Sequence, residues 1–202
     1  PQKVAAMEGN WETQSNVPLL LCAIPNEETR SNSMEVGIPN MASIILKHKA
    51  EGVVPGLNDF VTEDGDVLHP PVAPVFWSFR IMVGTGFAML ALSWFAAFMM
   101  LRKGRGPDAL PKVALFAMVP MAFSGWVATL AGWYTTEIGR QPWLVQGVLT
   151  TEQAVADVPA PFVGITLAAY LSIYVLLLTA YIAVLFYLAR KGVTGDVPRP
   201  RT

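Results

Sequence analysis

Cysteine and histidine, the side chains that most often form cross-links or bind metals, are almost absent from this chain of 202 residues. Cys22 is the single cysteine, which excludes a disulfide or a cysteine-based metal site within the chain. The two histidines, His48 and His69, lie in polar segments, and we expect neither of them to be a ligand. Charged residues make up only 14% of the chain and its net charge is −1, so nothing in the composition indicates nucleic-acid binding.

The chain contains three long stretches without any charged residue, which is not typical of a soluble protein. Hydrophobic residues account for 53% of the chain, and three charge-free stretches of 21, 24 and 32 residues explain this excess. About 20 apolar residues are enough to cross the hydrocarbon core of a lipid bilayer, so each stretch can form a transmembrane helix. We therefore predict an all-α integral membrane fold, with a transmembrane region 71–202 whose helices lie at about 75–101, 112–137 and 161–189.

The charges outside these stretches are distributed unevenly. The loop 102–112 and the tail 190–202 each carry four basic residues and one acidic residue, whereas residues 1–70 carry ten acidic and four basic residues. The positive-inside rule therefore places the basic loop and the tail in the cytoplasm. Residues 1–70 and the loop 138–157 are then expected on the outer face of the membrane.

Residues 1–70 form a separate extramembrane region in this interpretation. It begins with a short helix that we expect to end near Gly9, and Asn40 is a candidate cap for a brief helix over 41–49. Residues 12–40 are rich in proline, asparagine, serine and glutamate, and we expect them to form a loop. The region as a whole is predicted to be an irregular segment attached to the membrane helices.

The most informative run of the chain is residues 132–143, where the second charge-free stretch meets a carboxylate and a guanidinium. Glu137 and Arg140 lie at the end of a membrane-length helix, and Trp133 shares their helical face. Ionisable groups at membrane depth indicate a functional site, because hydrocarbon does not solvate them. The alternatives are an exposed structural ion pair and a carboxylate that binds a metal or carries protons.

Four further residues have both a structural and a functional interpretation. Arg80 could extend its guanidinium to the lipid headgroups, and Met82 alone would more often fill a core than bind a metal. Lys3 and Glu8 are five positions apart on the first short helix, which is too far around the helix for an ideal pair, and they could belong to a solvated face. Each of the four could equally serve a cofactor or substrate.

Taken together, these motifs resemble subunit I of the cytochrome bd quinol oxidases. The resemblance depends on the Phe-Arg-x-Met element within residues 76–84 and on the Glu-x-Gly-Arg-Gln-Pro-Trp element within residues 132–143. Lys3 and Glu8, followed by residues 11–13, resemble the start of the quinol-binding loop of that family. The resemblance extends over essentially all 202 residues, as the carboxyl-terminal part of the subunit and of the short-loop type.

The resemblance implies a role for each residue of the membrane helices named above. Met82 matches the axial thioether ligand of heme b558, and Arg80 matches the arginine beside that heme. Glu137 matches a carboxylate at heme b595, either as iron ligand or as proton-handling group. Arg140 then matches a partner of the heme propionates, and Trp133 an aromatic side chain close to the heme pair.

The resemblance also implies the activity and its partners. Lys3 and Glu8 match residues required for oxidation of ubiquinol or menaquinol, with Glu8 as the better candidate for accepting a quinol proton. The whole enzyme of the bacterial inner membrane would reduce O2 to water, building a proton gradient without pumping. It would need oxidase subunit II and an amino-terminal part of subunit I before Pro1, which would supply the histidine ligands and hold heme d.

Two other classes of protein remain open on the sequence alone. A non-catalytic membrane assembly subunit would use Glu137 and Arg140 as a structural pair. A proton-coupled transporter fragment would use Glu137 as a proton relay.

Overall fold

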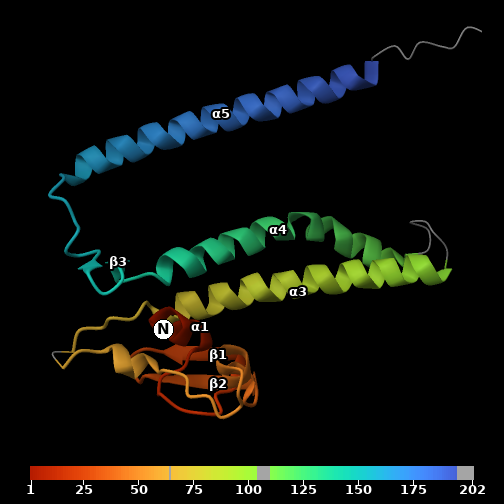
Figure 1. The fold of residues 1–202 in the computed structure, drawn as a ribbon. Coiled ribbons are helices and arrows are strands. Elements are labelled where there is room, and N and C mark those ends of the chain that lie inside the picture. The colour runs from red at the N-terminus through yellow and green to blue at the C-terminus, as the bar shows by residue number, and fades with distance from the viewer. Residues whose placement is uncertain (64, 104–109, 195–202) are drawn as a thin grey trace, which may run out of the picture. The chain divides into compact units, whose positions relative to one another are not determined.

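The computed structural model describes residues 1–63, 65–103 and 110–194 (Figure 1). The chain divides into two compact units, residues 1–154 and 155–202, and each is described by itself. The first unit contains α1 (Gln2–Glu8), β1 (Leu19–Asn26), β2 (Ser31–Ile38), α2 (Met41–Lys47), the 3-10 helix η1 (Leu57–Phe60), α3 (Val72–Lys103), α4 (Lys112–Ile138), β3 (Trp143–Val145) and β4 (Leu149–Thr150). The second unit contains α5 (Ala160–Thr194).

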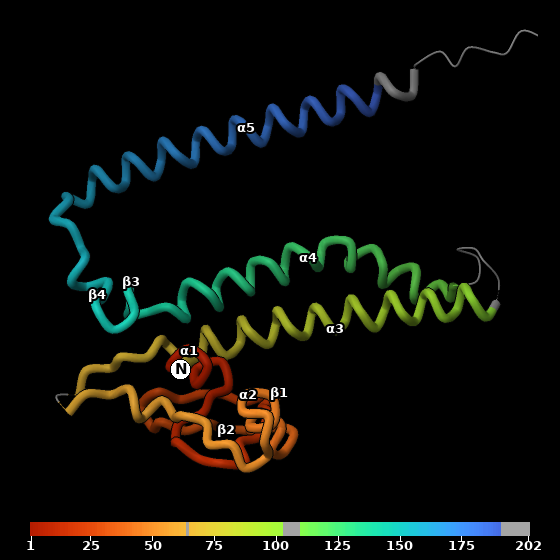
Figure 2. Tube along the Cα trace, viewed as in Figure 1, coloured from red at the N-terminus to blue at the C-terminus, as the bar shows by residue number. Residues whose placement is uncertain are grey.

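Three helices, α3, α4 and α5, are long and apolar enough to cross a membrane. This confirms the predicted fold class, and each helix is longer than its charge-free stretch. Helices α3 and α4 run side by side in opposite directions (Figure 2). Few residues of α3 and α4 are fully buried and many of their large apolar side chains are exposed, so lipid or other protein must cover them.

The amino-terminal segment, residues 1–70, is more regular than the sequence indicates. Strands β1 and β2 pair antiparallel as a hairpin within 12–40, where we expected a loop. Two register shifts along β1 interrupt the alternation of buried and exposed side chains, and β2 is exposed along almost all of its length. The hairpin therefore lacks the period-two apolar pattern by which a strand is usually recognised.

Helix α2 forms where a brief helix was expected, but Asn40 does not cap it with its side chain. Asn40 adopts a left-handed conformation with φ 62°, and the helix ends at Lys47 because His48 is also left-handed. Ser43 is buried instead, and its hydroxyl accepts a hydrogen bond from the Val17 amide at 2.9 Å. Asn40 therefore occupies the cap position, as predicted, and its carbonyl accepts the Ile44 amide at 3.0 Å, but its side chain makes no cap hydrogen bond.

A small apolar core joins the amino-terminal segment to the first turns of α3. Ala6 of α1, Trp11 and Leu57 are buried against Val72 and Val75 of α3. A second cluster joins Leu20 and Ala23 of β1 to Phe76, which is likewise fully buried. The segment is thus held on the end of a membrane helix by its own hydrophobic contacts.

Gly9 ends α1 at the point where this segment meets α3. Its φ of 65° is left-handed, and the amides of Gly9 and Asn10 bond back to the Ala6 and Ala5 carbonyls. A Cβ at this position would lie 3.1 Å from the Phe76 ring. Two constraints, backbone conformation and close packing, therefore both require glycine here.

We expect Gly9→Ala to destabilise the amino-terminal segment more than the left-handed conformation alone would. That conformation costs a non-glycine residue about 1–2 kcal/mol, and the contact with Phe76 adds to it. Gly147→Ala is the matched control, because Gly147 has a similar φ of 71° and no described atom lies within 4 Å of its Cβ position. Melting temperature and limited proteolysis of the intact protein in detergent measure the difference; equal losses in both variants would contradict a contribution from Phe76.

Candidate functional site

The predicted site residues of the amino-terminal segment and the membrane helices form two groups at one end of α3 and α4. Glu8 and Arg80 make up the first group, with an ion pair of 3.8 Å between the arginine Nη2 and the glutamate Oε2. Lys3, Glu137 and Arg140 make up the second group, at the end of α4. Lys3 and Glu8, which the resemblance assigns to one quinol site, therefore lie at opposite ends of α1 and contact different membrane helices.

The guanidinium of Arg80 is bound almost entirely by the amino-terminal segment. Nε and Nη2 both donate to the Leu20 carbonyl, at 2.9 and 2.5 Å, and Nη1 donates to the Met7 carbonyl. Nη1 also donates to the Phe76 carbonyl at 3.3 Å, and the guanidinium carbon lies 3.4 Å from the centre of the Phe76 ring. Only 11% of the side chain is exposed, so Arg80 does not extend to the headgroups.

Glu8 is a buried carboxylate with few compensating contacts. Its side chain is 8% exposed, and among the described residues no donor lies within hydrogen-bonding distance of Oε2. Burial raises the pKa of the Glu8 carboxyl above its ordinary value of 4.5, and the positive charge of Arg80 lowers it in part. A carboxyl in this state can accept a proton more readily than a solvated one.

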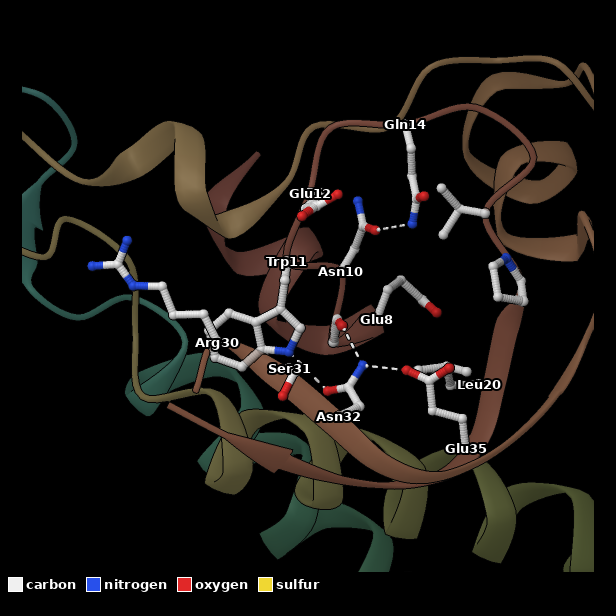
Figure 3. Close-up of a pocket in the computed structure, with 13 residues that line it drawn as sticks. Glu8, Asn10, Trp11, Glu12, Gln14, Leu20, Arg30, Ser31, Asn32 and Glu35 are labelled. Carbon is white, nitrogen blue, oxygen red and sulfur yellow. Dashed lines mark hydrogen bonds between the residues drawn. The ribbon is translucent and has the colours of Figure 1, made fainter. Parts of the chain in front are cut away.

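An open cavity of about 320 Å³ lies beside Glu8 and is lined by the end of α1, the following residues and the hairpin (Figure 3). Asn32 of β2 organises one wall of it. Its side-chain oxygen accepts the Trp11 indole N–H at 2.8 Å, and its amide donates to the Gly9 carbonyl and to the Glu35 carboxylate at 2.9 Å each. The cavity thus combines an aromatic ring, fixed hydrogen-bonding groups and a buried carboxylate.

A smaller cavity of about 190 Å³ lies at the other end of α1 and is lined by Lys3 and Arg140. The ammonium of Lys3 donates to the Thr136 carbonyl at 3.4 Å, and its side chain packs on Gly139. A cation beside the last carbonyls of a helix is favourable, because these carbonyls carry a partial negative charge. Two cationic side chains therefore meet at the end of α4.

Glu137 and Arg140 form the i, i+3 pair that their spacing predicts, with 3.4 Å between Oε1 and Nη2. The two side chains are 45% and 51% exposed, so within this chain the pair resembles a surface ion pair, a kind that contributes about 0–1 kcal/mol. Trp133 on the same helix is 58% exposed. All three side chains are accessible to a group bound against α4.

Met82 is half-buried and faces α4. Its Sδ atom lies 3.0 Å from the position that a Cβ of Gly132 would take, so the thioether fills the gap left by that glycine. One turn further along α3, no described atom lies within 4 Å of the Cβ position of Gly86. The side chain has three flexible torsions, so its thioether can adapt to what lies against it.

The donor atoms at the two helices suit heme groups in chemical type. An accessible carboxylate beside a guanidinium fits an iron atom and a propionate, and a thioether on an apolar helix fits a low-spin iron. Within the described residues no cluster of three histidine, cysteine, aspartate or glutamate side chains could hold a metal ion by itself.

Sequence reasoning missed two features of the site around Glu8: its contact with Arg80 and the hairpin wall of the larger cavity. The contact between Glu8 and Arg80 joins residues far apart in the chain, and neither position signals the other. Asn32 and Glu35 lie in the hairpin that we expected to be a loop, where polar residues are ordinary. Of the residues that hold Asn32, Trp11 belonged to a recognised motif. Its indole contact could have been anticipated, because a buried indole N–H needs an acceptor.

Comparison with known proteins agrees with the resemblance described above. The model of one family, cytochrome bd terminal oxidase subunit I, matches residues 1–193. The cytochrome bd ubiquinol oxidase subunit 1 of Bacillus subtilis (strain 168) is 33% identical over 205 residues, covering 97% of this chain and 43% of that protein. The cytochrome bd-II ubiquinol oxidase subunit 1 of Escherichia coli (strain K12) is 28% identical over 255 residues, covering 95% and 49%.

A second protein of Bacillus subtilis (strain 168), the putative cytochrome bd menaquinol oxidase subunit I, is 30% identical over 193 residues, covering 95% of this chain and 41% of that protein. The chain spans less than half the length of these curated relatives. The family model, by contrast, matches nearly the whole chain. The chain therefore belongs to the cytochrome bd terminal oxidase subunit I family.

Proposed function

We propose that this chain is the carboxyl-terminal part of subunit I of a bacterial cytochrome bd-type terminal oxidase, which oxidises quinol and reduces O2 to water. The observation that carries the proposal is the buried carboxylate of Glu8 at the wall of the larger cavity. Family membership supports a terminal quinol oxidase. The names of two relatives include ubiquinol and that of the third includes menaquinol, so either quinol is a candidate substrate.

The larger cavity is the proposed site of the quinol headgroup. Its volume of about 320 Å³ suits a single planar ring with two hydroxyl groups. Glu8 would accept a hydrogen bond from one hydroxyl and then its proton, because its raised pKa makes the carboxylate a stronger base. Lys3 lies in the smaller cavity, so its proposed contribution is electrostatic, at the end of α4.

The helices carry the proposed heme contacts. Met82 would hold heme b558 through its thioether sulfur, with Arg80 near that heme. Trp133, Glu137 and Arg140 would line the site of heme b595, and residues outside this chain would bind heme d. When bound, the hemes supply the one-electron steps that move electrons from quinol to O2.

The distribution of charges supports the proposed orientation. The basic loop 102–112 and tail 190–202 would face the cytoplasm, leaving the amino-terminal segment outside the bacterial inner membrane. Quinol protons would then be released outside, while protons for O2 reduction come from the cytoplasm. A gradient forms in this way without a pump, and subunit II and the amino-terminal part of subunit I complete the enzyme.

Replacement of the proposed base should remove quinol oxidation while leaving the hemes in place. We expect Glu8→Gln in the complete oxidase to lower kcat for quinol by about 100-fold or more, because general-base catalysis contributes about 10²–10⁴-fold. The measurement is steady-state quinol oxidation combined with the heme spectrum. Glu12→Gln is the matched control, since Glu12 lines the same cavity but is exposed.

The pH dependence provides a second measurement on the same variants. The ionised carboxylate is the active form, so kcat/KM should rise with pH through the Glu8 pKa, which lies above the ordinary carboxyl value. This rise should disappear in Glu8→Gln and remain in Glu12→Gln. Wild-type rates in Glu8→Gln would disprove the assignment of Glu8.

Met82→Leu tests the proposed ligand of heme b558. Leucine has a similar volume and fills the gap at Gly132 at a cost below about 1.5 kcal/mol, but it offers no sulfur. We expect the low-spin heme signal to be lost or shifted in optical and redox titrations. Met89→Leu, a half-buried methionine on the same helix, is the control; an unchanged b558 signal in Met82→Leu would exclude the ligand role.

Glu137→Gln tests the site at the end of α4. If Glu137 binds or faces the iron of heme b595, the spectrum of the high-spin heme should change, while its surface pair with Arg140 predicts almost no loss of stability. Glu152→Gln, an exposed carboxylate in the following loop, is the control. An unaltered high-spin spectrum would instead favour a structural pair, as in a non-catalytic assembly subunit.

A further inference from the structure

The resemblance assigns Arg80 to a heme, but the contacts of its guanidinium are with the amino-terminal segment. All three of its nitrogen atoms donate to backbone carbonyls, two of them to Leu20 of β1, and Met7 of α1 supplies another acceptor. The plane of the guanidinium is in addition held on the Phe76 ring. A planar guanidinium held by four hydrogen bonds has a more fixed position than the flexible ammonium of a lysine.

The fixed position of Arg80 determines where Glu8 lies. Met7 and Glu8 are consecutive in the last turn of α1, and Arg80 contacts both, through the Met7 carbonyl and the Glu8 carboxylate. Since no described donor hydrogen-bonds to the Oε2 atom of Glu8, Arg80 is the nearest compensation for its charge. The other charged groups around the cavity, Glu12, Arg30 and Glu35, belong to exposed residues.

We propose that Arg80 is a positioning residue for Glu8, which docks α1 and β1 on α3 and supplies the countercharge of the carboxylate at the wall of the larger cavity. This inference rests on the proposed function of Glu8 in quinol oxidation. It gives Arg80 a task in the proton chemistry of quinol that is separate from any effect on a heme. The family resemblance to an arginine beside heme b558 does not contain this task.

The proposal predicts a specific change in the pH profile of the complete oxidase. Arg80→Gln removes the positive charge 3.8 Å from the carboxylate, and loss of an opposite charge at this range raises a carboxyl pKa by about 1–3 units. The rise of kcat/KM with pH should therefore move to higher pH by a similar amount, with activity recovering at the alkaline end. Arg80→Lys retains a charge but not the planar fork, so we expect a smaller shift in the same direction.

A double-mutant cycle separates this role from a purely heme-related one. In the Glu8→Gln background, Arg80→Gln should have no further effect on the pH profile, because the carboxylate that it positions is gone. The midpoint potential of heme b558, measured in the same four proteins, reports any separate effect on the heme. An unchanged pH profile in Arg80→Gln, or an equal shift in both backgrounds, would overturn the proposal.

Two further comparisons keep the test decisive. If Arg80→Gln fails to assemble, judged by heme content, Phe76→Leu removes the ring beneath the guanidinium without changing charge and should shift the profile slightly to higher pH. Phe79→Leu on the same helix is its control and should leave the pH profile unchanged. Equal profiles in the two variants would overturn the proposal.

The two proposals fail in different ways. If Glu8→Gln retains wild-type activity, the proposed function of Glu8 fails. If Glu8→Gln loses activity but the pH profile of Arg80→Gln is unchanged, only the positioning role of Arg80 is refuted.

Discussion

The contact between Arg80 and the backbone of the amino-terminal segment is the interaction on which the site depends. A single guanidinium on α3 contacts β1 and α1, which lie 60 and 73 positions earlier in the chain. Because the same group faces Glu8, the fold of the segment and the electrostatics of its buried carboxylate have one common origin. Removal of one partner of a buried pair leaves the other charge uncompensated, so we expect a substitution at either position alone to be destabilising.

The amino-terminal segment and the membrane helices obtain their stability in different ways. The segment has its own small core, formed by Trp11, Leu57 and Phe76 with their neighbours, and a dense set of side-chain hydrogen bonds. The membrane helices bury little within this chain, and residues such as Trp94 and Trp126 are largely exposed. Lipid or other protein must therefore cover the apolar side chains of these helices.

The sequence predicted the membrane helices well and the amino-terminal segment poorly, for a physical reason. Absence of charge over about 20 residues is a strong constraint imposed by the bilayer, and it identified all three helices. The hairpin has no comparable constraint, because the irregular register of β1 and the exposure of β2 remove the alternation of side chains. The i, i+3 contact of Glu137 with Arg140 follows from local helix geometry, whereas the contact of Glu8 with Arg80 depends on tertiary structure.

Helix α1 is only seven residues long, yet its two ends are attached to different membrane helices. Lys3 holds the carboxyl end of α4, and the last turn holds Arg80 of α3. The helix therefore links the carboxyl end of α4 to the first turns of α3. Because the two cavities lie at opposite ends of α1, the length of this one short helix sets the distance between them.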